Sequence, residues 1–299
     1  MFTANNYTPK FQNGIPKPVF LVILGTFTYK IVKKSSLSAK KMLEYVHGVF
    51  DMIPKVFHYC WLSNEPFPEK VQKCMASWEK FLGDYNCIFW DYEKAVATGI
   101  PWILEALEQQ NWAFAADAVR LYALYTYGGI YLDSDVELLM SPNHLLDRAY
   151  ILGYENGSKR IEPSFLGAEK ESPIIGEALR YYAEHHYEYS EETVEQLVLP
   201  QILANACDKF DGLDILPEWY FSPKRFLDGA INTADETVSI HHFGSNWRPE
   251  NVRECINQRQ KIFQKYPRPV AEVLAFPFTI WSNLRTVGPG GAIKRLFKK

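Results

Sequence analysis

An apolar helical segment that runs through a double glycine into a short apolar strand constrains this sequence most. Residues 113–127 are rich in Ala and Leu and stop at Gly128-Gly129. The apolar run 130–132 follows directly and ends at Asp133 and Asp135. Helices commonly end at glycine, and a short apolar run after such a break is typical of a buried strand. The pattern predicts a helix, a tight turn and a strand that carries two carboxylates at its end.

The flanking sequence alternates further strand-like and helix-like segments. Short runs of β-branched and aromatic residues predict strands, and apolar residues at helical spacing predict helices. Such alternation predicts an α/β fold with a mixed, mostly parallel sheet flanked by helices. The further predicted strands are 53–61, 86–90, 150–154, 164–168, 213–216 and 237–242, and the further predicted helices are 68–81, 101–110, 172–182 and 196–207.

Chemically capable side chains fall at the ends of predicted strands. Trp61, Asp133, Asp135 and His242 each end or follow one of these segments. Ligands of open α/β sheets bind outside the carboxyl ends of the strands. The sequence therefore predicts one site that collects residues from three distant parts of the chain.

The acidic triplet predicts a metal site. Carboxylates two residues apart on a strand point to the same side, because side chains alternate. Two anions held so close need a cation, and carboxylate oxygens suit Mn²⁺ or Mg²⁺. A solvated turn explains most isolated D-x-D sequences, so the prediction rests on the strand and the double glycine that precede Asp133 and Asp135.

Asp117 and Arg120 form a second charged pair within the helix before the triplet. Residues three apart share one helix face, so a structural ion pair is the simple interpretation. The remainder of this helix is almost entirely apolar, which favours a functional role. An arginine there can clamp a phosphate, and an aspartate can accept from a hydroxyl.

An indole and a polar cluster supply the remaining candidates. Trp61 can stack on a nucleobase or pack in the core. His241-His242 lie close to Ser245 and Trp247. A neutral imidazole can complete a metal shell, while Ser and indole N–H groups can donate to phosphate.

Charge and cysteine content narrow the class of protein. The 299 residues include 32 Lys and Arg against 35 Asp and Glu, a net charge of −3. Without a basic surplus, nucleic acid is not an expected partner. The five cysteines show no CxxC pair or zinc-ligand spacing, which favours reduced thiols in the cytoplasm.

Both ends of the chain raise the question of membrane contact. Residues 18–32 are apolar but short for a span of about 20 residues. We expect 1–51 to be an extension, either membrane-contacting or the product of a start codon assigned too early. We expect a catalytic domain at 52–250. In the expected C-terminal tail, 251–299, aromatic residues precede basic ones, which suits peripheral contact with the inner face of the cytoplasmic membrane.

Together these residues resemble glycosyltransferase family 32, whose members carry a DXD sugar-binding region. The matching segments are ordered and spaced as in the family and cover roughly Met52 to Trp247. They are IPKVFHYCW, AFAADAVRLYALYTYGG, IYLDSDVELL and HHFGSNW. The resemblance points to bacterial enzymes of capsule or lipopolysaccharide synthesis.

The resemblance implies a GT-A fold and a retaining hexosyltransferase that uses Mn²⁺ or Mg²⁺. The donor would be a nucleotide sugar, with UDP and galactose favoured, and the acceptor a glycan or lipid-linked saccharide. The implied catalytic residues are Asp133, Asp135 and Arg120. The implied metal ligands are Asp135 and Asp133 with His242 or His241, and the implied donor-binding residues are Trp61, Asp117, Arg120, Asp133, Ser245 and Trp247.

Three alternatives compete with this interpretation. A phosphatase of the haloacid dehalogenase type also uses D-x-D. Its pattern has Thr or Val two places after the second Asp, where this chain has Glu137. The strand that carries its D-x-D also lies near the start of the domain, whereas two strands and three helices are predicted before Asp133. An inactive nucleotide-sugar-binding protein would keep the fold but not the turnover. A toxin-like protein glycosyltransferase would modify a host protein, although no delivery segment is recognisable.

Overall fold

The chain divides into two units, residues 1–50 and 51–299. The computed structural model describes residues 53–188, 197–226, 228–244 and 250–297, all in the second unit, and side chains up to Arg285. The elements are β1 (Val56–Cys60), α3 (Glu69–Phe81), β2 (Asn86–Trp90), α4 (Tyr92–Ala97), α5 (Pro101–Glu108), α6 (Trp112–Tyr127), β3 (Gly129–Leu132), β4 (Val136–Leu138), η1 (Pro142–Leu145), β5 (Tyr150–Ile151), β6 (Phe165–Ala168), α7 (Pro173–Glu184), α9 (Leu199–Cys207), η2 (Glu218–Tyr220), β7 (Ser239–His241), α10 (Glu250–Lys265) and α11 (Arg268–Phe297).

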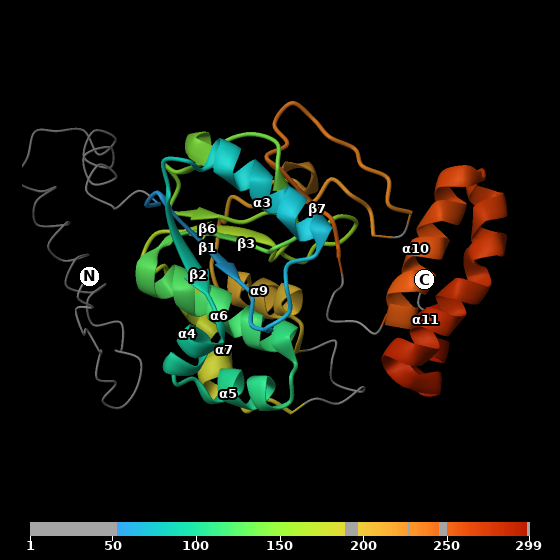
Figure 1. Cartoon of the computed structure of the whole chain (residues 1–299), viewed down its shortest axis with the longest axis horizontal. Coiled ribbons are helices and arrows are strands. Elements are labelled where there is room, and N and C mark those ends of the chain that lie inside the picture. Colours follow the sequence, from blue (N-terminus) through green and yellow to red (C-terminus); the bar gives the residue numbers. More distant parts are fainter. Residues whose placement is uncertain (1–52, 189–196, 227, 245–249, 298–299) are drawn as a thin grey trace, which may run out of the picture. The chain divides into compact units, whose positions relative to one another are not determined.

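The central sheet has the strand order β2-β1-β3-β6-β5 (Figure 1). β1 pairs in parallel with both β2 and β3, whereas β6 is antiparallel to β3 and to β5. Only β6 therefore runs against the other strands of this sheet. A separate two-stranded antiparallel sheet joins β4 to β7. The expected class, an α/β fold with a mixed, mostly parallel sheet flanked by helices, is confirmed.

Alternate side chains of the sheet enter two different cores. Ile130 and Leu132 of β3 pack on one face with Trp78 of α3. Tyr131 lies on the other face, in the core built from α5, α6, α7 and α9. Figure 1 shows α3 on one side of the sheet and these four helices on the other. The period of two along a strand thus fixes which layer each side chain stabilises.

The Gly128-Gly129 pair turns the end of α6 into β3, as the sequence predicts. Gly128 has φ 67° and Gly129 has φ 104°. A Cβ on Gly129 would collide with the carbonyl oxygen of Val56 on the neighbouring strand. Glycine is therefore required here by the backbone conformation and by the close approach of β1.

His58 of β1 connects three elements from a fully buried position. One ring nitrogen, Nε2, lies 2.8 Å from the carbonyl oxygen of Gly128, and the other, Nδ1, accepts from the Trp90 indole at 3.2 Å. These two contacts require a neutral ring with its proton on Nε2. Burial lowers the pKa of His58 to about 4, against the opposing effect of the hydrogen bond to Gly128.

This histidine is expected to make the protein less stable in mild acid. The folded state resists protonation, while the unfolded chain takes up a proton at the ordinary pKa of 6.5. Stability from this group is complete above pH 6.5 and falls by about 3 kcal/mol towards pH 4. Urea unfolding between pH 7 and pH 4.5 measures it. The variant His58→Gln cannot titrate and should flatten the dependence; an unchanged slope would contradict the assignment.

Several predicted strands differ from the structure in extent or existence. The strand predicted at 150–154 is confined to β5, Tyr150–Ile151. Residues 213–216 form no strand; Leu216 makes only an isolated bridge with Gly153. The strand predicted at 237–242 is confined to β7, and β4, its partner, was not predicted.

Candidate functional site

Asp133 and Asp135 occupy the turn between β3 and β4. The backbone N–H of Asp133 donates to Ser164 O at 2.8 Å, which continues the β3–β6 pairing. The N–H of Val136 then donates to Asp133 O at 3.0 Å and turns the chain into β4. The strand end therefore presents both carboxylates at one edge of the sheet, as the sequence predicts.

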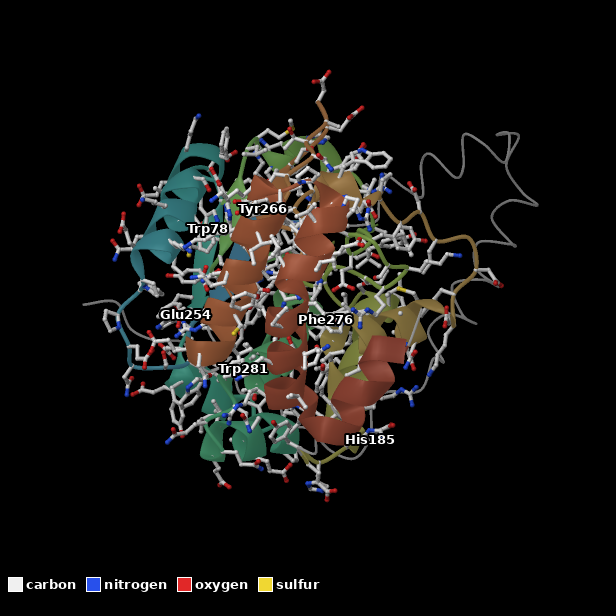
Figure 2. All side chains as sticks on the ribbon, turned by 90° about the vertical axis from the view of Figure 1, so that its right-hand side faces the viewer. Trp78, His185, Glu254, Tyr266, Phe276 and Trp281 are labelled. Atoms are coloured by element: carbon white, nitrogen blue, oxygen red, sulfur yellow. The ribbon has the colours of Figure 1, made fainter. Side chains whose placement is uncertain are left out.

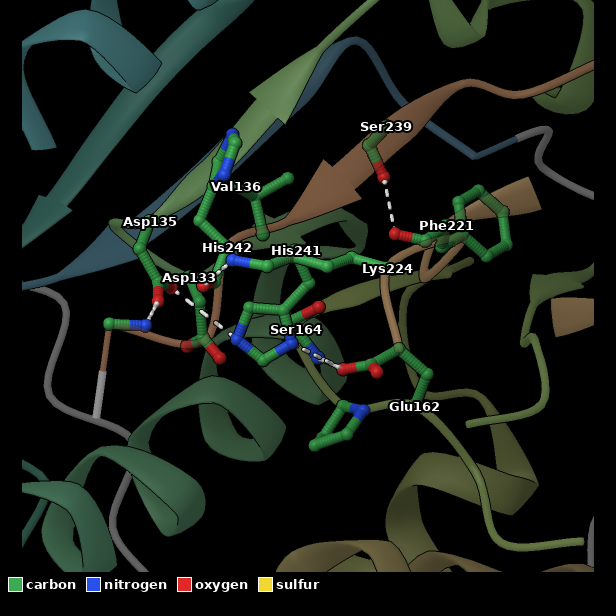
Figure 3. A network of polar contacts seen from close by, with 12 residues as sticks. Asp133, Asp135, Val136, Glu162, Ser164, Phe221, Lys224, Ser239, His241 and His242 are labelled. Carbon is green, nitrogen blue, oxygen red and sulfur yellow. Dashed lines mark hydrogen bonds and ion pairs between the residues drawn. The ribbon is translucent and has the colours of Figure 1, made fainter. Parts of the chain in front are cut away.

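His241 joins the two carboxylates from the other end of the chain. β7 places it opposite Val136, one residue beyond Asp135. Asp133, Asp135 and His241 offer ligand atoms that all lie within 4.8 Å of one another. His241 Nε2 is 3.5 Å from an Asp135 oxygen, and Gly244 N–H donates to Asp135 at 2.5 Å (Figure 3).

Glu162 lies behind His241 and was not predicted from the sequence. Its carboxylate is 3.2 Å from His241 Nδ1, and the side chain is 1% exposed. Ser164 N–H donates to Glu162 at 3.0 Å and fixes the carboxylate. Because Glu162 engages Nδ1, the ring presents Nε2 towards Asp135, as Figure 3 shows.

The cluster holds its charges by mutual attraction. Burial raises the pKa of Asp135, but the facing His241 outweighs it and brings that pKa to about 2. Glu162 follows the same logic, with burial opposed by His241, and its pKa is also about 2. Burial lowers the pKa of His241, yet Asp135 and Glu162 together raise it well above 6.5. For Asp133, burial dominates over Arg120 and raises the pKa.

Arg120 contacts the cluster through Asp133, and 6% of its side chain is exposed. Its terminal nitrogens are 2.8 Å from Asp117 Oδ1, 3.2 Å from both Asp133 oxygens and 2.8 Å from Pro163 O. The guanidinium also packs 4.7 Å from the centre of the Tyr131 ring. These contacts engage both terminal guanidinium nitrogens, Nη1 and Nη2, so the geometry of Arg120 suits it to orient and neutralise Asp133.

Asp117 is a carboxylate whose burial is only partly compensated. Burial raises its pKa to about 7, although Arg120 and the backbone N–H of Leu199 favour the charged form. That backbone group is the first of α9. Asp117 therefore connects α6 to the start of α9 at the edge of the site.

The arrangement fits a divalent cation. Two carboxylates and an imidazole are suitable ligands for Mn²⁺ or Mg²⁺, and three protein ligands leave coordination positions for phosphate oxygens. A carboxylate behind a ligating histidine fixes ring orientation in many metal sites, and Glu162 has that position. Asp135, Asp133 and His241 would hold the ion.

The other predicted site residues have different surroundings. Half-buried Trp61 follows β1 at the same sheet edge; its indole donates to Glu65 O at 2.8 Å and its ring packs 5.0 Å from Phe67. His242 is directed away from the cluster, with Nε2 2.7 Å from Glu137. Ser245 and Trp247 lie outside the described residues.

Comparison with protein families finds a known region in this chain. Residues 68–152 match the family described as "Glycosyltransferase sugar-binding region containing DXD motif". This range runs from the start of α3 past β5 and includes Asp117, Arg120, Asp133 and Asp135. This part of the chain is therefore similar to a glycosyltransferase DXD region, which agrees with the coarser part of the resemblance.

The curated relatives are fungal and plant proteins. Inositol phosphoceramide mannosyltransferase 3 of Schizosaccharomyces pombe is 33% identical over 158 residues, covering 48% of this chain and 42% of that protein. Mannosyl phosphorylinositol ceramide synthase SUR1 of Saccharomyces cerevisiae is 31% identical over 135 residues, covering 40% and 34%. An uncharacterized Arabidopsis thaliana protein is 30% identical over 147 residues, covering 48% and 18%. The chain spans less than half the length of these relatives. They are not the bacterial capsule or lipopolysaccharide enzymes that we expected.

Solved glycosyltransferase structures are more distant. The PaToxG glycosyltransferase gives a TM-score of 0.41 at 15% identity, covering 64% of this chain and 80% of that one. The glycosyltransferase domain of the YGT toxin gives 0.40 at 11% identity, covering 82% and 94%. At such scores the fold assignment rests on the sheet topology itself.

Proposed function

We propose that this chain is a metal-dependent glycosyltransferase that moves a hexose from a nucleotide sugar to a glycan or lipid-linked acceptor. The observation that carries the proposal is the convergence of Asp133, Asp135 and His241 within 4.8 Å at the end of β3. The match of residues 68–152 to a DXD sugar-binding region supports it.

The residues of the site suit the departure of a nucleoside diphosphate. A divalent cation bound there would stabilise negative charge on the leaving diphosphate. Asp133, Asp135 and His241 hold that position, and Arg120 keeps Asp133 oriented from below. Trp61, at the same sheet edge, would stack on the base, and Asp117 would accept from a sugar hydroxyl. We propose retention of anomeric configuration; an inverted product seen by NMR would contradict it.

The sugar and the acceptor are proposed from two sources. The sequence resemblance favours UDP and galactose. The names of the yeast relatives instead point to mannose and to inositol phosphoceramide. Both sources agree on transfer of a hexose to a lipid-linked acceptor. We propose that this transfer serves the synthesis of a surface polysaccharide or a glycolipid.

A donor screen tests the proposed activity. Purified full-length protein would be incubated with UDP-galactose, UDP-glucose, UDP-N-acetylglucosamine and GDP-mannose, with Mn²⁺, with Mg²⁺ and with EDTA. We expect slow metal-dependent release of one nucleoside diphosphate, accelerated by a lipid-linked saccharide. Donor binding without turnover would instead identify an inactive sugar-nucleotide-binding protein, and turnover only with a protein acceptor would identify a toxin-like enzyme.

Glu162→Gln is expected to weaken metal binding while leaving the fold intact. Glutamine keeps the size of the side chain but removes the charge that orients and polarises His241. Loss of such a carboxylate typically costs about 10- to 100-fold in metal affinity. Isothermal titration with Mn²⁺ measures the change. Glu155→Gln is the matched control, because Glu155 pairs with Arg160 instead; equal affinities of the two variants would contradict the role of Glu162.

A further inference from the structure

The long final helix, α11, has an exposed apolar face. Ala271 and Ala275 are buried on the side that packs against α10. Val273 is 73% exposed, and Val270, Leu274 and Leu284 are each at least 40% exposed. Spacings of three, four and eleven residues bring these side chains to one side of a helix, away from the face that carries the buried alanines.

Further aromatic and apolar side chains widen this face. Phe276 is 52% exposed beside it. Phe278 and Trp281 line a groove of about 480 Å³ between α10 and α11, and Figure 2 labels Phe276 and Trp281 along the hairpin. Between Pro269 and Leu284 the only charged residue is Glu272, which is paired with Arg268 at 3.0 Å. Exposed apolar surface of this extent marks an interaction site.

The charges that follow this face indicate what covers it. After Glu272 the sequence contains no acidic residue, but it contains Arg285, Lys294, Arg295, Lys298 and Lys299. Arg285 packs 5.3 Å from the centre of the Trp281 ring, so cation and indole lie together at the edge of the face. This positive segment belongs to a chain with a net charge of −3. The sequence that follows the apolar face is therefore locally basic, and Arg285 is the member of it that contacts the face.

We propose that α11 docks on an anionic lipid bilayer with its apolar face inserted and Arg285 at the headgroups. Interfacial helices combine apolar side chains, indoles and cations in this way. Within the part of the chain that the structure describes, no helix is long and apolar enough to cross a membrane. The proposal goes beyond the glycosyltransferase activity and does not depend on it.

Two occupants could cover the apolar face of α11, a membrane or a second copy of this chain, and their charge distinguishes them. A second copy would cover the apolar face but would bring a second set of the same basic residues to the complex. A membrane rich in anionic lipid covers the apolar face and neutralises the cations together. We therefore favour the bilayer, and self-association is an alternative outcome of the test.

Vesicle sedimentation of the full-length protein tests the proposal without a nucleotide sugar. Vesicles of phosphatidylcholine alone would be compared with vesicles containing one third phosphatidylserine, at low and high salt. We expect binding to the anionic vesicles, weakened by salt. The double variant Val273→Glu, Phe276→Glu should bind at least ~10-fold more weakly. Val96→Glu, at a 39% exposed position on α4, is the matched control and should bind normally.

Circular dichroism and light scattering of each variant complete the experiment. A folded double variant that binds as well as the native chain overturns the proposal, as does native protein that ignores anionic vesicles. A dimer that dissociates in the double variant, with no vesicle binding in either form, assigns the face to self-association and also overturns it. Donor hydrolysis is measured separately in soluble form, so failure of vesicle binding is distinct from failure of the glycosyltransferase proposal.

Discussion

Replacing Asp135 by alanine is expected to reduce metal-dependent turnover at least ~1,000-fold. Asp135 belongs to the cluster with Asp133 and His241 and accepts the Gly244 N–H as well. Alanine removes one proposed metal ligand and the carboxylate that accepts the Gly244 N–H. The donor would bind with its leaving diphosphate uncompensated, so the chemical step loses most of its stabilisation.

The fold should survive this change. β4 is held independently of the carboxylate, because Trp78 donates to Val136 O and Leu138 N–H donates to Ser77, both at 2.8 Å. Hydrolysis rates across a Mn²⁺ titration, with circular dichroism on the same sample, measure both parts of the prediction.

A control two residues away makes the test of Asp135 specific. Glu137→Gln removes the carboxylate that faces His242 at 2.7 Å, outside the cluster. A partly exposed pair of this kind contributes little, so turnover should stay within about threefold of the native rate. Survival of full activity in Asp135→Ala, or equal loss in both variants, would show that the site is wrongly identified.

Arg120→Met is expected to destabilise the protein by about 3–5 kcal/mol and to abolish turnover. The guanidinium lies between Asp117 and Asp133 with 6% of its side chain exposed. Methionine fills much of the space but leaves two buried carboxylates and Pro163 O without their donor. An uncompensated buried charge costs far more than an intact pair contributes.

Urea unfolding at pH 7 measures the loss, and a double variant separates its two causes. Asp117→Leu combined with Arg120→Met removes one of the stranded charges and should recover part of the stability, but no activity, because Asp133 remains unsupported. Arg120→Lys keeps the charge without the fork that reaches both aspartates, so it should lie between native and Arg120→Met. An unfolding free energy within about 1 kcal/mol of native for Arg120→Met would contradict the buried network.

The sequence predicted the central strands because their signals are local. β2 has the bounds predicted from the apolar run 86–90, and β3 begins at Gly129, one residue before the predicted start. All four residues of β3 are buried, which makes that run continuously apolar. β2 is an edge strand whose first two residues are exposed, and its signal is the short apolar run Ile88-Phe89-Trp90. The helix α4 was missed although Asp91 caps it by accepting from Lys94 N–H; a single short turn has too few apolar positions to show a period.

Only those site residues that belong to a recognisable local sequence pattern were predicted. Asp133 and Asp135 are recognisable by their spacing after a strand, whereas Glu162 stands alone before Pro163 with no pattern around it. Its role follows from a contact with His241 that only the tertiary structure provides. The choice between His241 and His242 was likewise open, because it depends on the pairing of β7 with β4, and β4 was not predicted.

The β4–β7 pairing also sets an order of events during synthesis. His242 N–H donates to Asp135 O, and Gly244 N–H reaches the Asp135 carboxylate across a separation of 109 residues. All five strands of the central sheet lie before residue 169, so they leave the ribosome well ahead of β7. A nascent chain can therefore assemble its sheet while the carboxylates still lack their imidazole. The proposed cation would therefore find its third ligand, His241, only after β7 has paired with β4.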